Sequence, residues 1–162
     1  LSKERAIKDL IIDKQDFWKK YDEVTPYLVA DVEPEPEKEN LVSPEEVEEL
    51  KEADYCIQSG ACYYSCPVLT VNENYLGPAQ LAKAYRFNAD VRDEAKKERL
   101  ETISQIGSGV WDCVKCFECV EVCPKDINPF EKITQLHLQT FEKGVAENNV
   151  ATRHAVGFKR SI

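Results

Sequence analysis

The sequence of 162 residues predicts an all-α protein in which helices wrap a core built around two cysteine-rich loops. Three observations support this fold class. Apolar residues recur at helical spacing between capping signals, no segment shows the sustained alternation of a strand, and all seven cysteines fall into two short bursts. A chain of this length is expected to form one domain, or one compact domain with a helical extension.

Residues 1–42 are expected to form one helix followed by an acidic linker. Residues 13–24 repeat apolar positions at helical spacing, and Pro26 then stops the helix. Residues 31–37 are acidic and interrupted by proline, so they cannot bury apolar surface and are predicted to be exposed. The start at Leu1, without a methionine, suggests a piece of a longer chain.

Residues 43–162 are expected to form the main helical domain, with irregular loops at the cysteines. Ser43 and Pro44 begin a helix that leads into the first cysteine burst. Further helices are predicted to start at Gly77, Asp93 and Asn128, with a last one over residues 150–159. One face of the helix after Asn128 is predicted to carry four partly apolar side chains: Phe130, Ile133, His137 and Phe141.

The net charge of −9 arises mainly in one segment. Residues 31–54 hold eleven acidic and two basic side chains, and the rest of the chain is balanced. Nucleic-acid binding is not expected, because it requires a basic face. No apolar run approaches the ~18 residues that cross a bilayer, so the chain itself is expected to be soluble and to reach a membrane through partners. The acidic segment is either solvated or a docking site for a basic partner.

The cysteines are predicted to bind metal. Seven is an odd number, which an all-disulfide framework cannot pair, and the two bursts span residues 56–66 and 113–123. Such clustering is more typical of metal ligation in a reducing compartment than of disulfides.

The second burst matches Cys-x2-Cys-x2-Cys-x3-Cys-Pro at every position, from Cys113 to Pro124. This is the run of bacterial two-cluster ferredoxins, in which three cysteines hold one iron-sulfur cube and the fourth reaches another cluster. A structural zinc site is the alternative, but zinc sites usually pair two Cys-x2-Cys units and require neither the third cysteine nor Cys-Pro.

The first burst repeats the same frame from Cys56 to Pro67, with Ser59 in the second cysteine position. The crossed rule of this motif predicts two ligand sets. Cluster A takes Cys56, Cys62 and Cys123, with Ser59 in the fourth position. Cluster B takes four cysteines, a complete set for a [4Fe-4S] cluster: Cys66, Cys113, Cys116 and Cys119.

Ser59 leaves the type of cluster A open. A serine hydroxyl is a harder and less acidic ligand than a thiol, so a [3Fe-4S] cluster or a cube with one labile iron is favoured. A [4Fe-4S] cluster with the serine oxygen as its fourth ligand is the alternative. An artificial substitution at Ser59 is a third interpretation.

Beyond the cysteines, the chain resembles the iron-sulfur subunits of succinate dehydrogenase and fumarate reductase. The similar segments are residues 75–79, 84–90, 92–93, 110–113 and 122–125. Residues 8–13 resemble the join that follows the two-iron domain of that family. The chain is therefore similar to the C-terminal two-cluster, α-helical ferredoxin part of such a subunit, without the N-terminal two-iron domain.

This resemblance implies the electron-relay subunit of an oxidoreductase complex, with no catalytic residues for substrate chemistry. Single electrons would pass between a flavoprotein subunit, where succinate and fumarate interconvert, and a quinone or another acceptor. The implied partners are that flavoprotein and a membrane anchor or a cysteine-rich acceptor subunit. The expected location is the cytoplasmic side of a membrane, reached through these partners.

Two positions depart from the family pattern. Family members usually lack a cysteine at the position of Cys116 and have a ligand that completes the other cluster at the position of Ser59. In this chain, cluster B therefore has the complete set of cysteines and cluster A lacks one, the reverse of the family pattern. His137 replaces a family lysine, and its ring either packs or contacts a quinone.

Two alternative functions remain from the sequence. Cys116 and residues 153–158 are also similar to thiol-linked fumarate reductases and heterodisulfide reductases, which pass electrons to a cysteine-rich subunit. A freestanding soluble carrier is the other alternative. Three aromatic residues beside the cysteines either tune the clusters or shield them: Tyr63, Tyr64 and Trp111.

Overall fold

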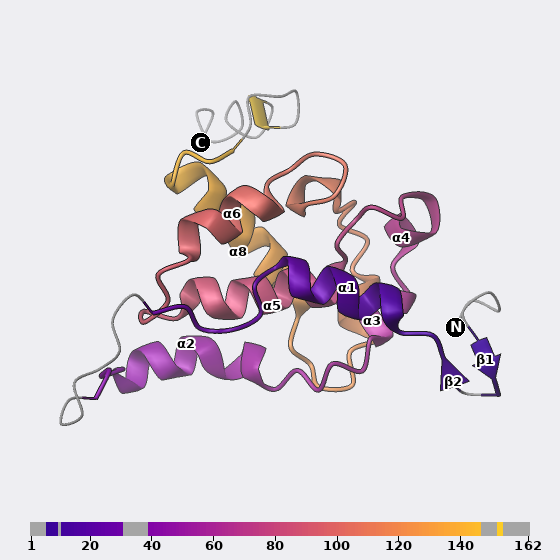
Figure 1. Ribbon diagram of the computed structural model, residues 1–162, viewed down its shortest axis with the longest axis horizontal. Helices are drawn as coiled ribbons and strands as arrows, with labels where there is room; N and C mark the ends of the chain where they lie inside the picture. The colour runs from indigo at the N-terminus through magenta and orange to yellow at the C-terminus, as the bar shows by residue number, and fades with distance from the viewer. Residues whose placement is uncertain (1–5, 10, 31–38, 147–151, 154–162) are drawn as a thin grey trace.

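The computed structural model describes residues 6–9, 11–30, 39–146 and 152–153, and it confirms the all-α fold class (Figure 1). The longer helices are α1 (Gln15–Glu23), α2 (Pro44–Asp54), α5 (Pro78–Ala89), α6 (Lys96–Ile103) and α8 (Pro129–Glu142). Shorter helical turns are α3 (Ala61–Tyr64), α4 (Pro67–Val71), the 3-10 turn η2 (Val110–Asp112) and α7 (Glu118–Glu121).

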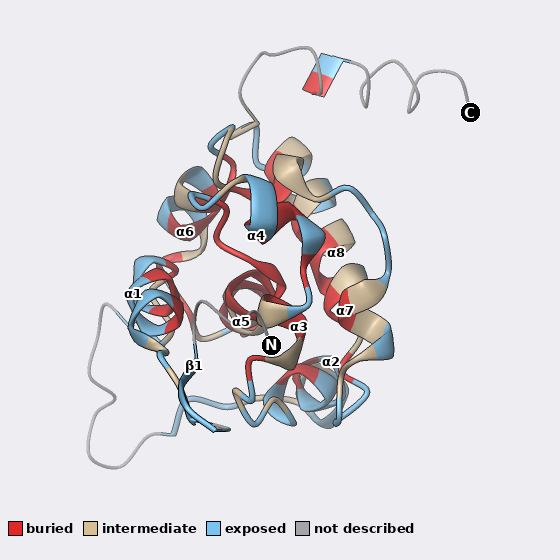
Figure 2. Cartoon of the chain, turned by 90° about the vertical axis from the view of Figure 1, so that its right-hand side faces the viewer, coloured by how far each residue is buried: buried red, intermediate tan, exposed pale blue. Residues whose placement is uncertain are grey.

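Helix α5 forms the centre of the molecule (Figure 2). Nine of its twelve residues are buried, because α1, α2, α6 and α8 all contact it. A helix that is buried on nearly every side needs small residues where neighbours approach closely, and Ala79, Ala82 and Ala84 supply them. The two cysteine-rich loops, with α3 and α7 in contact, lie against the N-terminal end of this helix.

The capping signals read from the sequence are confirmed at two helices. Ser43 Oγ accepts a hydrogen bond from the Glu46 amide, and the Glu46 carboxylate accepts one from the Ser43 amide at 2.7 Å. Asn128 accepts from the Glu131 amide at the start of α8. Both caps satisfy amides that lack an intrahelical partner.

The predicted start of α6 at Asp93 is wrong by one turn, because the helix begins at Lys96. The Asp93 carboxylate accepts two hydrogen bonds from buried Arg99, at 2.8 and 3.1 Å, and one from the Val29 amide. Arg99 also donates to the carbonyls of Val24 and Thr25. A tertiary ion pair therefore engages the side chain that could otherwise cap the helix.

Two further expectations need correction. A short antiparallel hairpin pairs β1 (Ala6–Lys8) with β2 (Ile11–Ile12), although no strand was predicted. Strands this short cannot produce a detectable alternation. The loops at the cysteines are also not wholly irregular, since α3, α4 and α7 lie within them. A three-residue gap between cysteines spans about one helical turn.

The prediction of which residues form the apolar face of α8 is only partly correct. Ile133 is buried, but Phe130, His137 and Phe141 are half-buried, and Leu136 lies at the centre of the stripe with no exposure. Helix α5 packs on that stripe and determines which side is covered. The acidic linker over 31–37 and most of the helix predicted over 150–159 lie outside the described residues. Within the described part of the chain, no helix has the length and apolar character to cross a membrane.

Candidate metal centres

The two cysteine-rich loops have the same backbone conformation, so the repeat in sequence is also a repeat in structure. Gln58 and Lys115 occupy equivalent positions with φ of 54° and 57°. Gly60 and Phe117 follow, with φ of 81° and 64°, and each precedes a four-residue helix, α3 or α7. We name residues 56–60 loop A and residues 113–117 loop B.

The loops and the short helices place the cysteines around two cavities. Cavity A has an empty volume of about 320 Å³, is open to solvent, and is lined by Cys56, Ser59, Cys62 and Cys123. Cavity B has an empty volume of about 340 Å³ and is lined by Cys66, Cys113, Cys116 and Cys119. All seven cysteines are free thiols.

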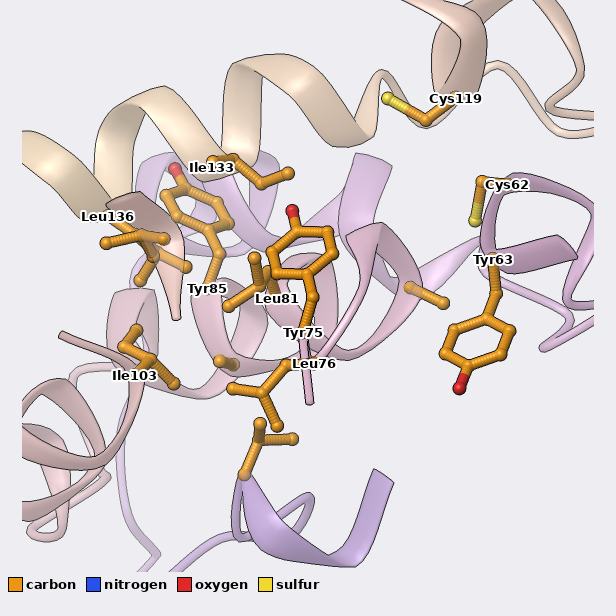
Figure 3. Close-up of a cluster of buried hydrophobic side chains, with 14 of the residues drawn as sticks. Cys62, Tyr63, Tyr75, Leu76, Leu81, Tyr85, Ile103, Cys119, Ile133 and Leu136 are labelled. Atoms are coloured by element: carbon orange, nitrogen blue, oxygen red, sulfur yellow. The ribbon is translucent and has the colours of Figure 1, made fainter. Parts of the chain in front are cut away.

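Each cavity takes its last cysteine from the other burst. Cys66 stands at the start of α4 and Cys123 follows α7, and each is followed by a proline that turns the chain away from the loop. The chain therefore brings together the two residue sets expected from the motif. Figure 3 shows Cys62 of α3 and Cys119 of α7 on neighbouring segments.

The thiols of the two cavities also influence one another's pKa values. Burial raises the pKa of Cys62 to about 12, and the charges of Cys56, Cys119 and Cys123 add to the effect. Burial also raises the pKa of Cys119 to about 12, followed by the charges of Cys113, Cys116 and Cys66. Burial likewise raises the pKa of Cys66. Thiolates in such positions need compensating positive charge.

The donor set of both cavities fits an iron-sulfur cluster. Soft thiolates are the ligands these clusters require, and metal coordination compensates the charge that burial disfavours. Among the described residues, no group of three or more His, Cys, Asp or Glu side chains is placed to hold a single metal ion. The thiols instead line two larger spaces.

Ser59 lines cavity A at the position that Cys116 occupies in cavity B, and both side chains are exposed. The Ser59 hydroxyl accepts a weak hydrogen bond from the Ala61 amide at 3.4 Å, and its carbonyl accepts one from Lys14 Nζ at 3.1 Å. Loop A therefore supplies a hydroxyl to cavity A at the position where loop B supplies a thiol to cavity B.

Tyr75 is a site residue that the motifs did not reveal. It lines cavity B together with Cys113, and its side chain is only 1% exposed. Burial raises the pKa of the phenol, and the neighbouring charges of Cys113 and Cys66 raise it further. Tyr75 lies between α4 and α5, outside both bursts, and no spacing rule links it to the cysteines.

The aromatic residues selected from the sequence serve mainly in packing. Tyr63 donates a short hydrogen bond to Asp16 and accepts one from Lys20 Nζ at 3.0 Å. Tyr64 donates to the Asp13 carbonyl. Neither tyrosine, nor Trp111, is among the described residues that line cavity A or cavity B.

His137 packs beside the approach to loop B. Its ring stacks on Trp111 with centroids 4.7 Å apart, and Nε2 donates to the Val110 carbonyl at 2.6 Å. Burial lowers the pKa of His137, and the charge of Lys115 lowers it further. These contacts favour the packing interpretation of this histidine.

Comparison with known proteins agrees with this geometry. Residues 52–127 match the 4Fe-4S dicluster domain family, and this range contains every cysteine of both cavities. The succinate dehydrogenase iron-sulfur subunit of Coxiella burnetii is 40% identical over 138 residues, which cover 85% of this chain and 58% of the relative. The fumarate reductase iron-sulfur subunit of Escherichia coli O6:H1 is 33% identical over 79% of this chain and 52% of the relative.

The chain contains a 4Fe-4S dicluster domain and is related in sequence to the iron-sulfur subunits of succinate dehydrogenase and fumarate reductase. An uncharacterized iron-sulfur protein of Methanocaldococcus jannaschii is 34% identical over 98% of this chain, which covers 32% of that protein. This iron-sulfur protein thus spans about half the length of the succinate dehydrogenase and fumarate reductase subunits that it matches. The relationship reaches well beyond the cysteine motifs, since the alignments extend over most of the chain.

Proposed function

We propose that this chain is an electron-relay subunit of an oxidoreductase complex of the succinate dehydrogenase and fumarate reductase type. In this proposal cluster A is held by Cys56, Cys62 and Cys123, with Ser59 beside its fourth position. Cluster B is held by Cys66, Cys113, Cys116 and Cys119. When bound, each cluster supplies a centre that takes up and releases single electrons.

The exchange of cysteines between the two cavities is the observation that carries this proposal. A disulfide framework would bring the sulfurs together in pairs, whereas here seven free thiols surround two adjacent spaces. The crossed pattern also places the two spaces next to each other, because α3 and α7 are in contact. Adjacent one-electron centres are suited to a relay.

Apolar side chains form part of the lining of both cavities. Ala79 and Ile127 border cavity A, and Val68, Pro78 and Ile133 border cavity B. Apolar walls of this kind limit water access and so influence the reduction potential. The proposed role is therefore electron transfer without substrate chemistry.

The proposed partners are a flavoprotein subunit on one side and an electron acceptor on the other. We take the N-terminal unit, residues 1–42, as the connection to a two-iron domain and residues 43–162 as the two-cluster domain. A quinone or a membrane anchor is the acceptor in the leading form of the proposal, with the complex on the cytoplasmic side of the membrane.

A second candidate is a relay that delivers electrons to a cysteine-rich subunit, as in thiol-linked fumarate reductases and heterodisulfide reductases. The completeness of cavity B favours it, since Cys116 supplies a fourth thiol there. The packed position of His137 is also compatible with an acceptor other than quinone. Affinity purification from the native source separates the candidates: a membrane cytochrome partner contradicts the second, and a soluble cysteine-rich partner contradicts the first.

The decisive test of the cofactor proposal is anaerobic purification followed by iron and sulfide quantitation and EPR spectroscopy. Iron below sulfide, with a paramagnetic oxidised sample, is expected if Ser59 leaves cluster A with three irons. Equal iron and sulfide with a silent oxidised sample would show two cubes and overturn the three-iron assignment. Zinc in the absence of iron and sulfide would overturn the proposed function itself.

A further inference from the structure

Tyr75 is held rigidly at the wall of cavity B. The next residue, Leu76, donates its amide to the Ser108 carbonyl at 2.8 Å, and Asn72 Nδ2 donates to the Gly107 carbonyl at 2.8 Å. These bonds tie the segment before α5 to the segment before loop B. The phenol ring is buried among apolar side chains, and Figure 3 shows its hydroxyl directed toward the side of Ile133 on α8.

Tyr75 lines the same cavity as the four cysteines of cluster B. Among the described residues lining this cavity, Tyr75 is the only buried polar side chain other than the cysteines, since Lys115 is exposed and Glu118 is half-buried. A buried hydroxyl without a hydrogen-bond partner is costly, and the cysteine sulfurs that line the same cavity can accept a hydrogen bond from it. A phenol is protonated at neutral pH, so it donates and the sulfur accepts.

We propose that Tyr75 is a positioning residue for cluster B that donates a hydrogen bond to the Cys113 sulfur and raises the reduction potential of that cluster. The inference rests on the proposed assignment of Cys113 as a ligand of cluster B. A reduced cluster carries more negative charge on its sulfurs than an oxidised one. A donor therefore stabilises the reduced state more, and the potential rises.

Cavity A has no counterpart of this phenol. Its lining residues in the described part of the chain include three polar side chains besides the cysteines, and none is buried: Gln58, Ser59 and Lys125. Gln58 donates its side-chain amide to the Tyr21 hydroxyl, so it is engaged away from the sulfurs. The effect of Tyr75 is accordingly expected at cluster B alone.

The test replaces Tyr75 by phenylalanine, which removes only the hydroxyl and keeps the ring that shields the cavity. The equilibrium constant for reduction of cluster B is expected to fall about threefold to tenfold, which corresponds to about 30 to 60 mV for a one-electron couple. EPR-monitored redox titration of the anaerobically purified protein measures this shift. Pulsed EPR in ordinary and deuterated buffer identifies the exchangeable protons near cluster B. The Tyr75→Phe protein is expected to show one such proton coupling fewer than the parent protein.

Tyr85→Phe is the matched control. Tyr85 is also buried, at 6% exposure, but its hydroxyl pairs with Glu49 at 3.4 Å and it does not line cavity B. Its removal is expected to leave both potentials unchanged.

Failure of the inference and failure of the proposed function give different results. If the Tyr75→Phe protein keeps its iron and sulfide, and the potential and the proton coupling stay as in the parent, the inference is wrong and the relay function stands. If the parent protein binds no cluster, the proposed function is wrong. A Tyr75→Phe protein without cluster B would contradict a role in tuning and indicate that the hydroxyl is needed for assembly.

Discussion

Loops A and B share a backbone but differ in what surrounds them. Helix α1 and the residue before it lie against loop A: Lys14 donates to the carbonyls of Gln58 and Ser59, and Gln58 donates to the Tyr21 hydroxyl. The loops differ most at one position, where Gly60 of loop A is buried and Phe117 of loop B is half exposed. The described aromatic contact of loop B is between Phe117 and Phe130 of α8, at 4.3 Å.

The difference shows which features the motif controls. Cysteine spacing determines the turn conformation in both loops, but the covering segment determines which residues that turn tolerates. Both loops need a left-handed residue before the short helix, and loop A uses Gly60 whereas loop B uses Phe117. An added Cβ on Gly60 would lie 2.9 Å from the ring of Tyr64 in α3, and that ring stacks on Phe17 of α1, so there is no room for a side chain at this position.

The largest expected effect comes from breaking the exchange of cysteines between the cavities. Cys66→Ser lies in the first burst but is expected to remove cluster B, because Cys66 lines cavity B. Cys123→Ser lies in the second burst but is expected to remove cluster A. Each variant should lose roughly half of the iron. Iron and sulfide quantitation with EPR identifies the cluster that remains.

Cys56→Ser and Cys113→Ser are the controls. Each replaces a cysteine in the burst that supplies most ligands of the cluster it is expected to remove: cluster A for Cys56 and cluster B for Cys113. If Cys66→Ser matches Cys56→Ser in its remaining EPR signal, and not Cys113→Ser, the crossed assignment is wrong.

Ser59→Cys removes the chemical difference between the two loops. Because the backbone at Gln58 and Gly60 already matches that of loop B, the new thiol is expected to reach cavity A and complete a fourth ligand. The iron-to-sulfide ratio should rise to one, and the signal of an oxidised three-iron cluster should disappear. Ser59→Ala is the control and should behave like the parent protein. Loss of iron in Ser59→Ala would instead indicate that the serine oxygen is a ligand.

Gly60→Ala tests the lack of space in loop A. The left-handed backbone and the contact with Tyr64 together are expected to destabilise the protein by about 2–4 kcal/mol. Gly144→Ala has a similar φ of 66° but nothing within 4 Å of the added Cβ, so it should cost only about 1 kcal/mol. Anaerobic urea unfolding measures both, and equal costs would mean that the cover over loop A does not matter.

The smallest expected effect is a pH dependence confined to loop B. Burial lowers the pKa of His137 in the folded state, so the unfolded state binds the proton more strongly. The stability that depends on neutral His137 is therefore fully present above its unfolded pKa of about 6.5 and is lost as pH falls below it. Protection factors, which divide out the intrinsic pH dependence of amide exchange, should fall more over residues 110–117 than over residues 56–60 when the pH is lowered from about 7.5 to 5.5. His137→Gln should remove this difference, and an equal fall in both loops would contradict the assignment to His137.

Much of the molecule was predictable because its signals are local. Helical spacing and the caps at Ser43 and Asn128 depend on residues a few positions apart, and these predictions are confirmed. The start of α6 was not predictable, because Asp93 pairs with Arg99 and with the distant Val29 amide. The hairpin near the N-terminus was missed because its strands are only three and two residues long.

For the site, the sequence by itself predicted which cysteines line each cavity, the repeat and the relationship to known iron-sulfur subunits, because cysteine spacing encodes how a loop can surround a cluster. Tertiary structure alone decided that Tyr75 lines cavity B with its cysteines, that His137 packs on Trp111, and that α1 lies against loop A. These contacts join segments far apart in the chain, and no local period records them. The physical reason is that the spacing of the cysteines determines the local conformation of each loop. Which side chains lie against that loop depends on the packing of segments distant in the sequence.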